Sequence, residues 1–132
     1  MTAVREPLDG EIVDAHHHLW VRSRHAQDWI DPHTMAATDA DFEPADLAGP
    51  AEMAGVTRTV VVQSISSVAE TVDLLRTATD TELIGGVVGW VDFTSPDVAD
   101  RLDELRTGYG GNHETAMVWG RTARRVYGLD LP

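Results

Sequence analysis

The sequence predicts an α/β domain built on a parallel β-sheet, and three observations carry this prediction. Apolar stretches at residues 11–15, 57–64 and 83–91 have the length of strands. Stretches with helical spacing lie between and after them, and alternating strands and helices imply parallel pairing through crossovers. The second and third stretches are apolar almost throughout, which is typical of strands buried on both faces of a parallel sheet.

Length and composition fit one domain without cysteine chemistry. The chain has 132 residues, of which 42% are hydrophobic and 24% charged, as in globular proteins. It contains no cysteine and no lysine, so disulfides, thiolate ligands and Schiff-base chemistry are excluded. The net charge of −12 argues against nucleic acid and membrane partners. Without a leader or a run of ~20 apolar residues, we expect a cytoplasmic protein.

The first strand, at residues 11–15, runs into His16, His17 and His18. Because side chains alternate along an extended chain, His16 and His18 should share one face and His17 should point away. Imidazole is a common ligand for zinc, although a catalytic zinc site usually has three protein ligands. From these residues alone, a metal-binding strand end and a solvent-facing polar turn are equally good interpretations.

Residues 19–42 show no sustained period and predict a long irregular excursion after the first strand. We interpret His25 and His33 as surface histidines, with a ligand role as the alternative. Trp20 and Trp29 either line a pocket or pack the excursion onto the core, and packing is the commoner role.

A helix is predicted at residues 44–54, broken or kinked at Gly49-Pro50 and capped by Gly55. After the second strand, Ser67 and Glu70 fit a capping box at the start of another helix. The residues of its expected buried stripe are Val68, Val72 and Leu75.

A third helix should start at Ser95-Pro96, with Val98, Leu102 and Leu105 buried. Residues 1–132 then form a single domain with three parts. The parts are residues 11–107 with the βα units, a glycine-rich joint at 108–112, and a last helix at 113–128. The joint lacks the spacing of a dinucleotide fingerprint or a P-loop, so a phosphate role has little support.

Polar or aromatic residues follow each predicted strand. Sites gather at the carboxyl edge of parallel sheets, although strand ends are also polar because they meet water. These residues are His16, His18, Gln63, Ser64, Trp90 and Asp92.

The stretch at residues 12–20, Ile-Val-Asp-Ala-His-His-His-Leu-Trp, resembles the opening strand of the amidohydrolase superfamily. The resemblance is to its amidohydrolase-related branch (amidohydrolase family 2), which includes sugar-lactone and pyrone-dicarboxylate lactonases. Residues 54–63, 83–92 and 120–129 are similar to the same branch. The resemblance implies a partial (β/α)₈ TIM-type barrel, with about three βα units and a closing C-terminal helix.

The resemblance also implies a divalent metal, zinc or alternatively manganese, held by His16 and His18 at the carboxyl rim. The family's general base, an aspartate after the eighth strand, and its histidines from the middle strands have no counterpart in this sequence, which therefore looks internally truncated. We expect the metal to be weakly held, and no catalytic residue is assigned. Asp14 is expected to orient the strand end, and Asp92 to begin a loop.

Two hypotheses follow, with a third in reserve. The first is a metal-dependent hydrolase that opens a lactone or similar cyclic ester or amide with metal-activated water, contacts substrate through Gln63 and Trp90, and is impaired in this short chain. The second is a non-catalytic partial barrel that self-associates or completes its sheet with a partner. The first is favoured for the family and the second for this chain; an unpaired sheet edge predicts a homo-oligomer. The third is a simple metal-binding protein that uses His16, His17, His18, His25 and His33.

Overall fold

A computed structural model describes residues 12–109 of the chain. Predictions on residues 1–11 and 110–132, including the last helix at 113–128, lie outside the described residues. Within the described part, none of the helices has the length and apolarity that a membrane crossing requires. The elements in order are β1 (Val13–His17), a 3₁₀ helix (Ala36–Thr38), α1 (Pro44–Ala54), β2 (Arg58–Val62), α2 (Val68–Asp80), β3 (Ile84–Val88) and α3 (Val98–Tyr109).

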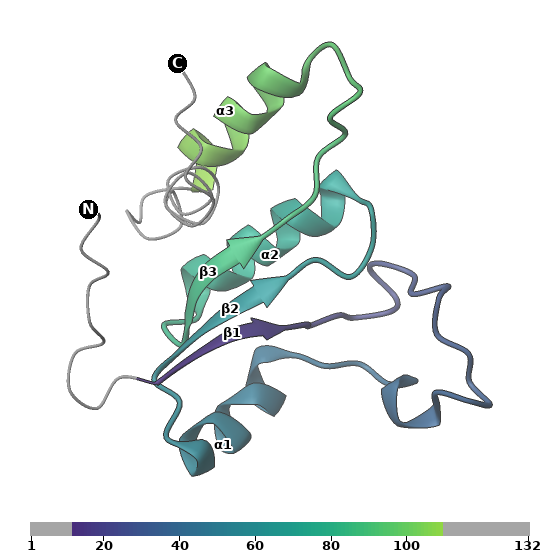
Figure 1. The fold of residues 1–132 in the computed structure, drawn as a ribbon, viewed down its shortest axis with the longest axis vertical. Coiled ribbons are helices and arrows are strands. Elements are labelled where there is room, and N and C mark those ends of the chain that lie inside the picture. Colours follow the sequence, from purple (N-terminus) through teal and green to yellow (C-terminus); the bar gives the residue numbers. More distant parts are fainter. Residues whose placement is uncertain (1–11, 110–132) are drawn as a thin grey trace, which may run out of the picture.

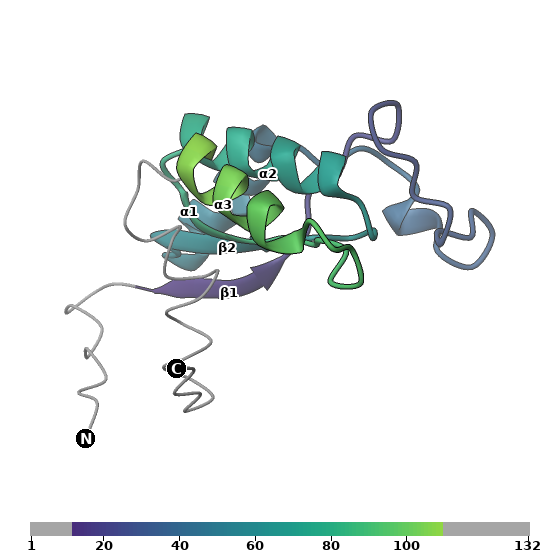
Figure 2. The same cartoon turned by 90° about the horizontal axis from the view of Figure 1, so that it is seen from above.

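The three strands form one parallel sheet in the order β1-β2-β3, which confirms the predicted α/β class. Figure 1 shows the strands side by side with their carboxyl ends at the same edge. In Figure 2 the helices lie along one side of the strands. The sheet therefore has one covered face within residues 12–109.

Buried and half-buried residues alternate along β2 because helices cover only one face of the described sheet. Thr59 and Val61 are buried toward the helices, whereas Val60 and Val62 on the opposite face are half-buried. The prediction that apolar strands are buried on both faces is therefore wrong for β2 in the described part, because helices cover only one face there.

The core lies between the sheet and helices α2 and α3. Its centre is Leu75 of α2 with Val61 of β2 and Val87 of β3, all at most 2% exposed. Leu74 is also buried while Val72 is only partly so, which means that the buried stripe of α2 is rotated from the predicted one. The core cluster consists of Leu19, Val61, Leu74, Leu75, Ile84, Val87, Val91 and Leu105.

Helix α1 runs through the predicted break. Pro50 lies inside it, and Gly55 ends it at φ 70°, which confirms the predicted cap. Proline clashes with the Cβ of the residue before it, and the preceding residue here is Gly49, which has no Cβ and open space around it. The helix therefore loses one backbone hydrogen bond at Pro50 without a steric clash from that residue.

Two boundaries differ from the prediction. β1 extends to His17 rather than ending at residue 15, so two of the three histidines lie in the strand. α3 begins at Val98 rather than at Ser95, because residues 92–95 form a hydrogen-bonded turn first. It continues to Tyr109, so the first two residues of the predicted joint are helical.

Candidate functional site

His16 and His18 lie together at the end of β1. Nε2 of His16 is 3.2 Å from Nε2 of His18, and the rings meet edge to face with centroids 5.0 Å apart. Both residues are exposed. The side chain of His17 points elsewhere, with Nε2 2.8 Å from Oγ1 of the buried Thr59. This placement agrees with the predicted alternation along the strand.

Hydrogen bonds orient the pair. Nδ1–H of His18 donates to the carbonyl of Val62 over 2.8 Å; because a carbonyl only accepts, the proton of neutral His18 sits on Nδ1 and Nε2 keeps its lone pair. Metal-binding histidines commonly donate their second ring N–H in this way. The carboxylate of Asp14 accepts the backbone N–H of His16 at 3.0 Å, which confirms that Asp14 orients the strand end.

His17 belongs to the packing of the helix-covered face. Burial lowers the pKa of its imidazole below the usual value, against the opposing effect of Asp14. Its Nδ1 is buried without a hydrogen-bond partner in the described structure. Among residues 12–109, no three His, Asp or Glu side chains are grouped so that they could hold a metal ion. The five-histidine site of the third hypothesis therefore finds no support.

The ends of β2 and β3 are fixed by backbone contacts. The N–H of Gln63 donates to the carbonyl of Val88 at 2.7 Å. The hydroxyl of Thr71, which is fully buried in α2, accepts the N–H of Trp90 at 2.8 Å and donates to its carbonyl at 2.9 Å. Gln63 and Trp90 thus hold fixed backbone positions at the carboxyl edge, and their contact with a substrate stays a prediction.

Asp92 is an exposed turn residue. Its Oδ1 accepts the hydroxyl of Thr94 at 2.6 Å and the N–H of the same residue at 2.9 Å. These two hydrogen bonds lower the pKa of Asp92 below its ordinary value of 3.8. This confirms that Asp92 begins the loop before α3, and a carboxylate with a lowered pKa is a poor general base.

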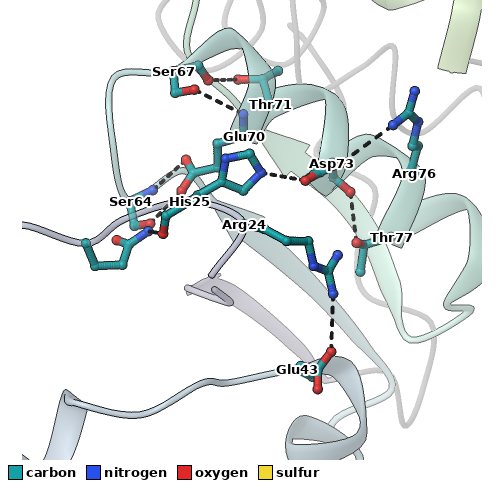
Figure 3. A network of polar contacts seen from close by, with 11 residues as sticks. Arg24, His25, Glu43, Ser64, Ser67, Glu70, Thr71, Asp73, Arg76 and Thr77 are labelled. Carbon is teal, nitrogen blue, oxygen red and sulfur yellow. Dashed lines mark hydrogen bonds and ion pairs between the residues drawn. The ribbon is translucent and has the colours of Figure 1, made fainter. Parts of the chain in front are cut away.

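A second polar cluster, which was not predicted from the sequence, is centred on Glu70 of α2 (Figure 3). Glu70 is only 2% exposed. Its carboxylate accepts the N–H and hydroxyl of Ser64 at 3.0 and 2.6 Å, and the N–H of Ile65 at 3.4 Å. The cluster locks the turn between β2 and α2, directly after Gln63.

This cluster corrects the predicted capping box. The hydroxyl of Ser67 does accept the N–H of Glu70 at 3.2 Å, but the Glu70 side chain turns to Ser64, and the N–H of Ser67 donates to Ile65 instead. Glu70 lies one turn before Leu74 and shares its helix face. That spacing was the sequence feature that could have placed Glu70 toward the sheet.

The excursion after β1 is tied to α2 by His25. Its Nε2 lies 2.5 Å from Oδ2 of Asp73, and its side chain is 17% exposed. The interpretation of His25 as a surface histidine is therefore wrong, because a carboxylate from α2 covers its ring (Figure 3). His33 is exposed, as predicted.

The two tryptophans pack rather than stand free. The ring of Trp20 meets Trp29 and Phe42 edge to face at 5.5 and 5.4 Å between centroids. Trp20 also lines a cavity of about 50 Å³ beside His25. That volume holds only a few water molecules. Trp20 therefore serves mainly to pack against Phe42, which contacts the core, whereas Trp29 is 45% exposed and contacts Trp20 from outside.

Comparison with known proteins relates this geometry to two lactonases. No protein-family model matches the chain. An L-fucono-1,5-lactonase from Burkholderia ambifaria is 42% identical over 93 residues, which is 70% of this chain and 32% of the lactonase. Another from Burkholderia multivorans is 31% identical over 94 residues, covering 71% and 31% of the two chains. The chain thus spans about a third of the length of these relatives.

Solved structures give the same relationship. A crystal structure of an amidohydrolase from Burkholderia multivorans with bound zinc matches with a TM-score of 0.65 at 29% identity, over 71% of this chain and 33% of that one. A second crystal form with bound HEPES gives a TM-score of 0.66 at 30% identity, over 73% and 33%. This chain is therefore similar to about a third of an amidohydrolase-superfamily protein. The resemblance to this superfamily and to its lactonase branch, suggested by the histidine stretch, is thereby confirmed.

Proposed function

We propose that this chain belongs to the amidohydrolase superfamily, forms the first βα units of a (β/α)₈ barrel and contributes two metal ligands to a lactone hydrolase. The observation that carries the proposal is the convergence of the His16 and His18 Nε2 atoms at the end of β1. The lactonase relatives support a lactone as the substrate class, and the zinc-bound relative supports zinc as the metal.

The pair passes a simple test of fit. Two nitrogens at the usual zinc–nitrogen distance in a tetrahedral site lie about 3.3 Å apart, and the two Nε2 atoms are 3.2 Å apart. The Val62 carbonyl leaves the lone pair of the His18 Nε2 available. Imidazole nitrogens suit zinc better than they suit manganese, so zinc is the ion that we propose.

When bound, a divalent ion supplies a Lewis acid for the lactone carbonyl and acidifies a water molecule. The residues of this chain position the reacting groups. His16 and His18 bind the ion, and Gln63 and Trp90 contact the lactone from the ends of β2 and β3. Asp14 is engaged with the backbone N–H of His16, so no general base is assigned within the described residues, and we expect weak activity.

Metal analysis of purified protein tests this proposal. Wild type and the control His33→Ala, which removes an exposed histidine away from β1, should carry zinc, and the double variant His16→Ala/His18→Ala should not. Hydrolysis of L-fucono-1,5-lactone should be slow in wild type and fall to background in the double variant. Equal zinc in all three proteins would refute the ligand assignment, whereas zinc without turnover would favour a non-catalytic partial barrel.

A further inference from the structure

Two adjacent residues of α2, Glu70 and Thr71, reach from their own helix to the ends of the neighbouring strands. Both are polar and almost fully buried, at 2% and 0% exposed. A buried polar side chain is costly unless its hydrogen bonds are satisfied, so the partners that these side chains take show what they hold in place. Glu70 contacts the chain shortly after β2, and Thr71 contacts the chain shortly after β3.

Thr71 holds the backbone on both sides of Trp90. Its Oγ1 accepts the N–H of Trp90 at 2.8 Å and donates to the carbonyl of Trp90 at 2.9 Å. These two groups belong to the peptide planes before and after the Cα of Trp90. Because peptide units are planar, holding both planes fixes φ and ψ, and with them the direction in which the side chain leaves the backbone. The carbonyl of Ser67 is a more distant acceptor, at 3.3 Å.

The other two threonines of α2, Thr77 and Thr79, use their hydroxyls differently. Each donates to the carbonyl four residues earlier in the same helix, at 2.8 and 3.0 Å. This local bond is a common choice for a threonine inside a helix. The hydroxyl of Thr71 instead makes its two shortest contacts with Trp90, so it serves the end of β3 rather than its own helix.

Glu70 has the same relation to Gln63. The N–H of Gln63 donates to the carbonyl of Val88 at 2.7 Å, which holds the peptide plane before its Cα. The plane after its Cα carries the N–H of Ser64, which donates to the carboxylate of Glu70 at 3.0 Å, and the hydroxyl of Ser64 donates to the same carboxylate at 2.6 Å (Figure 3). Glu70 thus fixes the ψ angle of Gln63, which the contact with β3 leaves open.

We propose that Glu70 and Thr71 are positioning residues for the lactone: Glu70 sets the direction of the Gln63 side chain, and Thr71 sets that of Trp90. The inference rests on the proposed function, because that function takes Gln63 and Trp90 as the substrate contacts. Both contacts are partly exposed, whereas Glu70 and Thr71 are buried and act through them. Since the two positioning residues are neighbours in α2, one helix fixes the spacing of two contacts that follow different strands.

NMR titration of the full chain with fresh L-fucono-1,5-lactone in zinc-containing buffer tests the proposal. Before lactone is added, Thr71→Val should shift the signals of Trp90 and leave those of Gln63 in place, and Glu70→Gln should do the reverse. Each variant should weaken lactone binding about 10-fold, because a displaced contact group loses its alignment with the ligand. Thr71→Ser keeps the hydroxyl and should bind the lactone as wild type does.

Further variants separate positioning from a general loss of stability. Ile84→Val removes a methyl group from the core at the start of β3, away from the carboxyl edge. It should lower stability and leave lactone binding unchanged. A loss of binding in Ile84→Val or Thr71→Ser as large as that in Thr71→Val would overturn the positioning role.

Two results distinguish this inference from the proposed function. Unchanged binding in Thr71→Val and Glu70→Gln, with weaker binding in Gln63→Ala and Trp90→Ala, would overturn this inference alone. Unchanged binding in Gln63→Ala and Trp90→Ala, or no lactone bound by wild type, would overturn the substrate contacts of the proposed function and this inference with them.

Discussion

Two polar clusters at the carboxyl edge of the sheet differ in whether their polar atoms can still bind a ligand. The carboxylate of Glu70 is buried, and both of its oxygens accept hydrogen bonds from the turn after β2. The imidazoles of His16 and His18 are exposed, and each is the other's partner through Nε2. A buried group with satisfied hydrogen bonds holds structure, whereas exposed nitrogens that converge are available to bind a ligand.

The largest change in stability is expected from substitution of Glu70. Glu70→Ala should lower the free energy of unfolding by about 2–4 kcal/mol, because the partly buried donors of Ser64 and Ile65 lose the carboxylate that accepts their hydrogen bonds. Urea denaturation measures the change. The matched control Glu82→Ala removes an exposed carboxylate and should stay within about 0.5 kcal/mol of wild type; similar losses in both variants would contradict a structural role for the cluster.

Thr71 should give the next largest effect. Thr71→Val keeps the shape of the side chain but removes the hydroxyl that bonds the N–H and carbonyl of Trp90, at a cost of about 1–2 kcal/mol. Amide hydrogen exchange at Trp90 should quicken in this variant. Thr79→Val, at an exposed position where the hydroxyl bonds only within α2, should leave that exchange unchanged.

The histidine pair should matter little to metal-free stability. Without zinc, His16→Ala/His18→Ala should change the free energy of unfolding by less than about 1 kcal/mol, because both side chains are exposed. Added zinc should raise the melting temperature of wild type and leave that of the variant unchanged. A metal-free loss as large as that of Glu70→Ala would show that the pair is structural.

The smallest effect concerns Asp92. Thr94→Val removes the hydroxyl that is the main cause of the lowered pKa of Asp92, so an NMR titration should show this pKa rising toward 3.8. A carboxyl with a lowered folded-state pKa stabilises the fold above its ordinary pKa, and this stability is lost as the pH falls through the folded value. The variant should therefore lose less stability on acidification; an unchanged pKa would contradict the assigned cause.

Local patterns in the sequence predicted the strand–helix order and the shared face of His16 and His18. Both depend on short-range periodicity, which a sequence displays directly. The direction of Glu70 and the pairing of His25 with Asp73, 48 residues away, depend on which segments meet in space. The end of β1 at His17 likewise depends on its pairing with Val61 of β2, which no feature of residues 11–18 alone could reveal.

An antiparallel bridge closes the excursion after β1 at its two ends. Trp20 and Phe42 form an antiparallel bridge, with two backbone hydrogen bonds of 3.0 and 2.8 Å. This bridge fixes both ends of the segment, so the positions of the strands do not depend on how many residues lie between Trp20 and Phe42. Because the cost of closing a loop grows only slowly with its length, the part of the segment beyond the His25–Asp73 contact could be lengthened while the histidines before the bridge keep their positions.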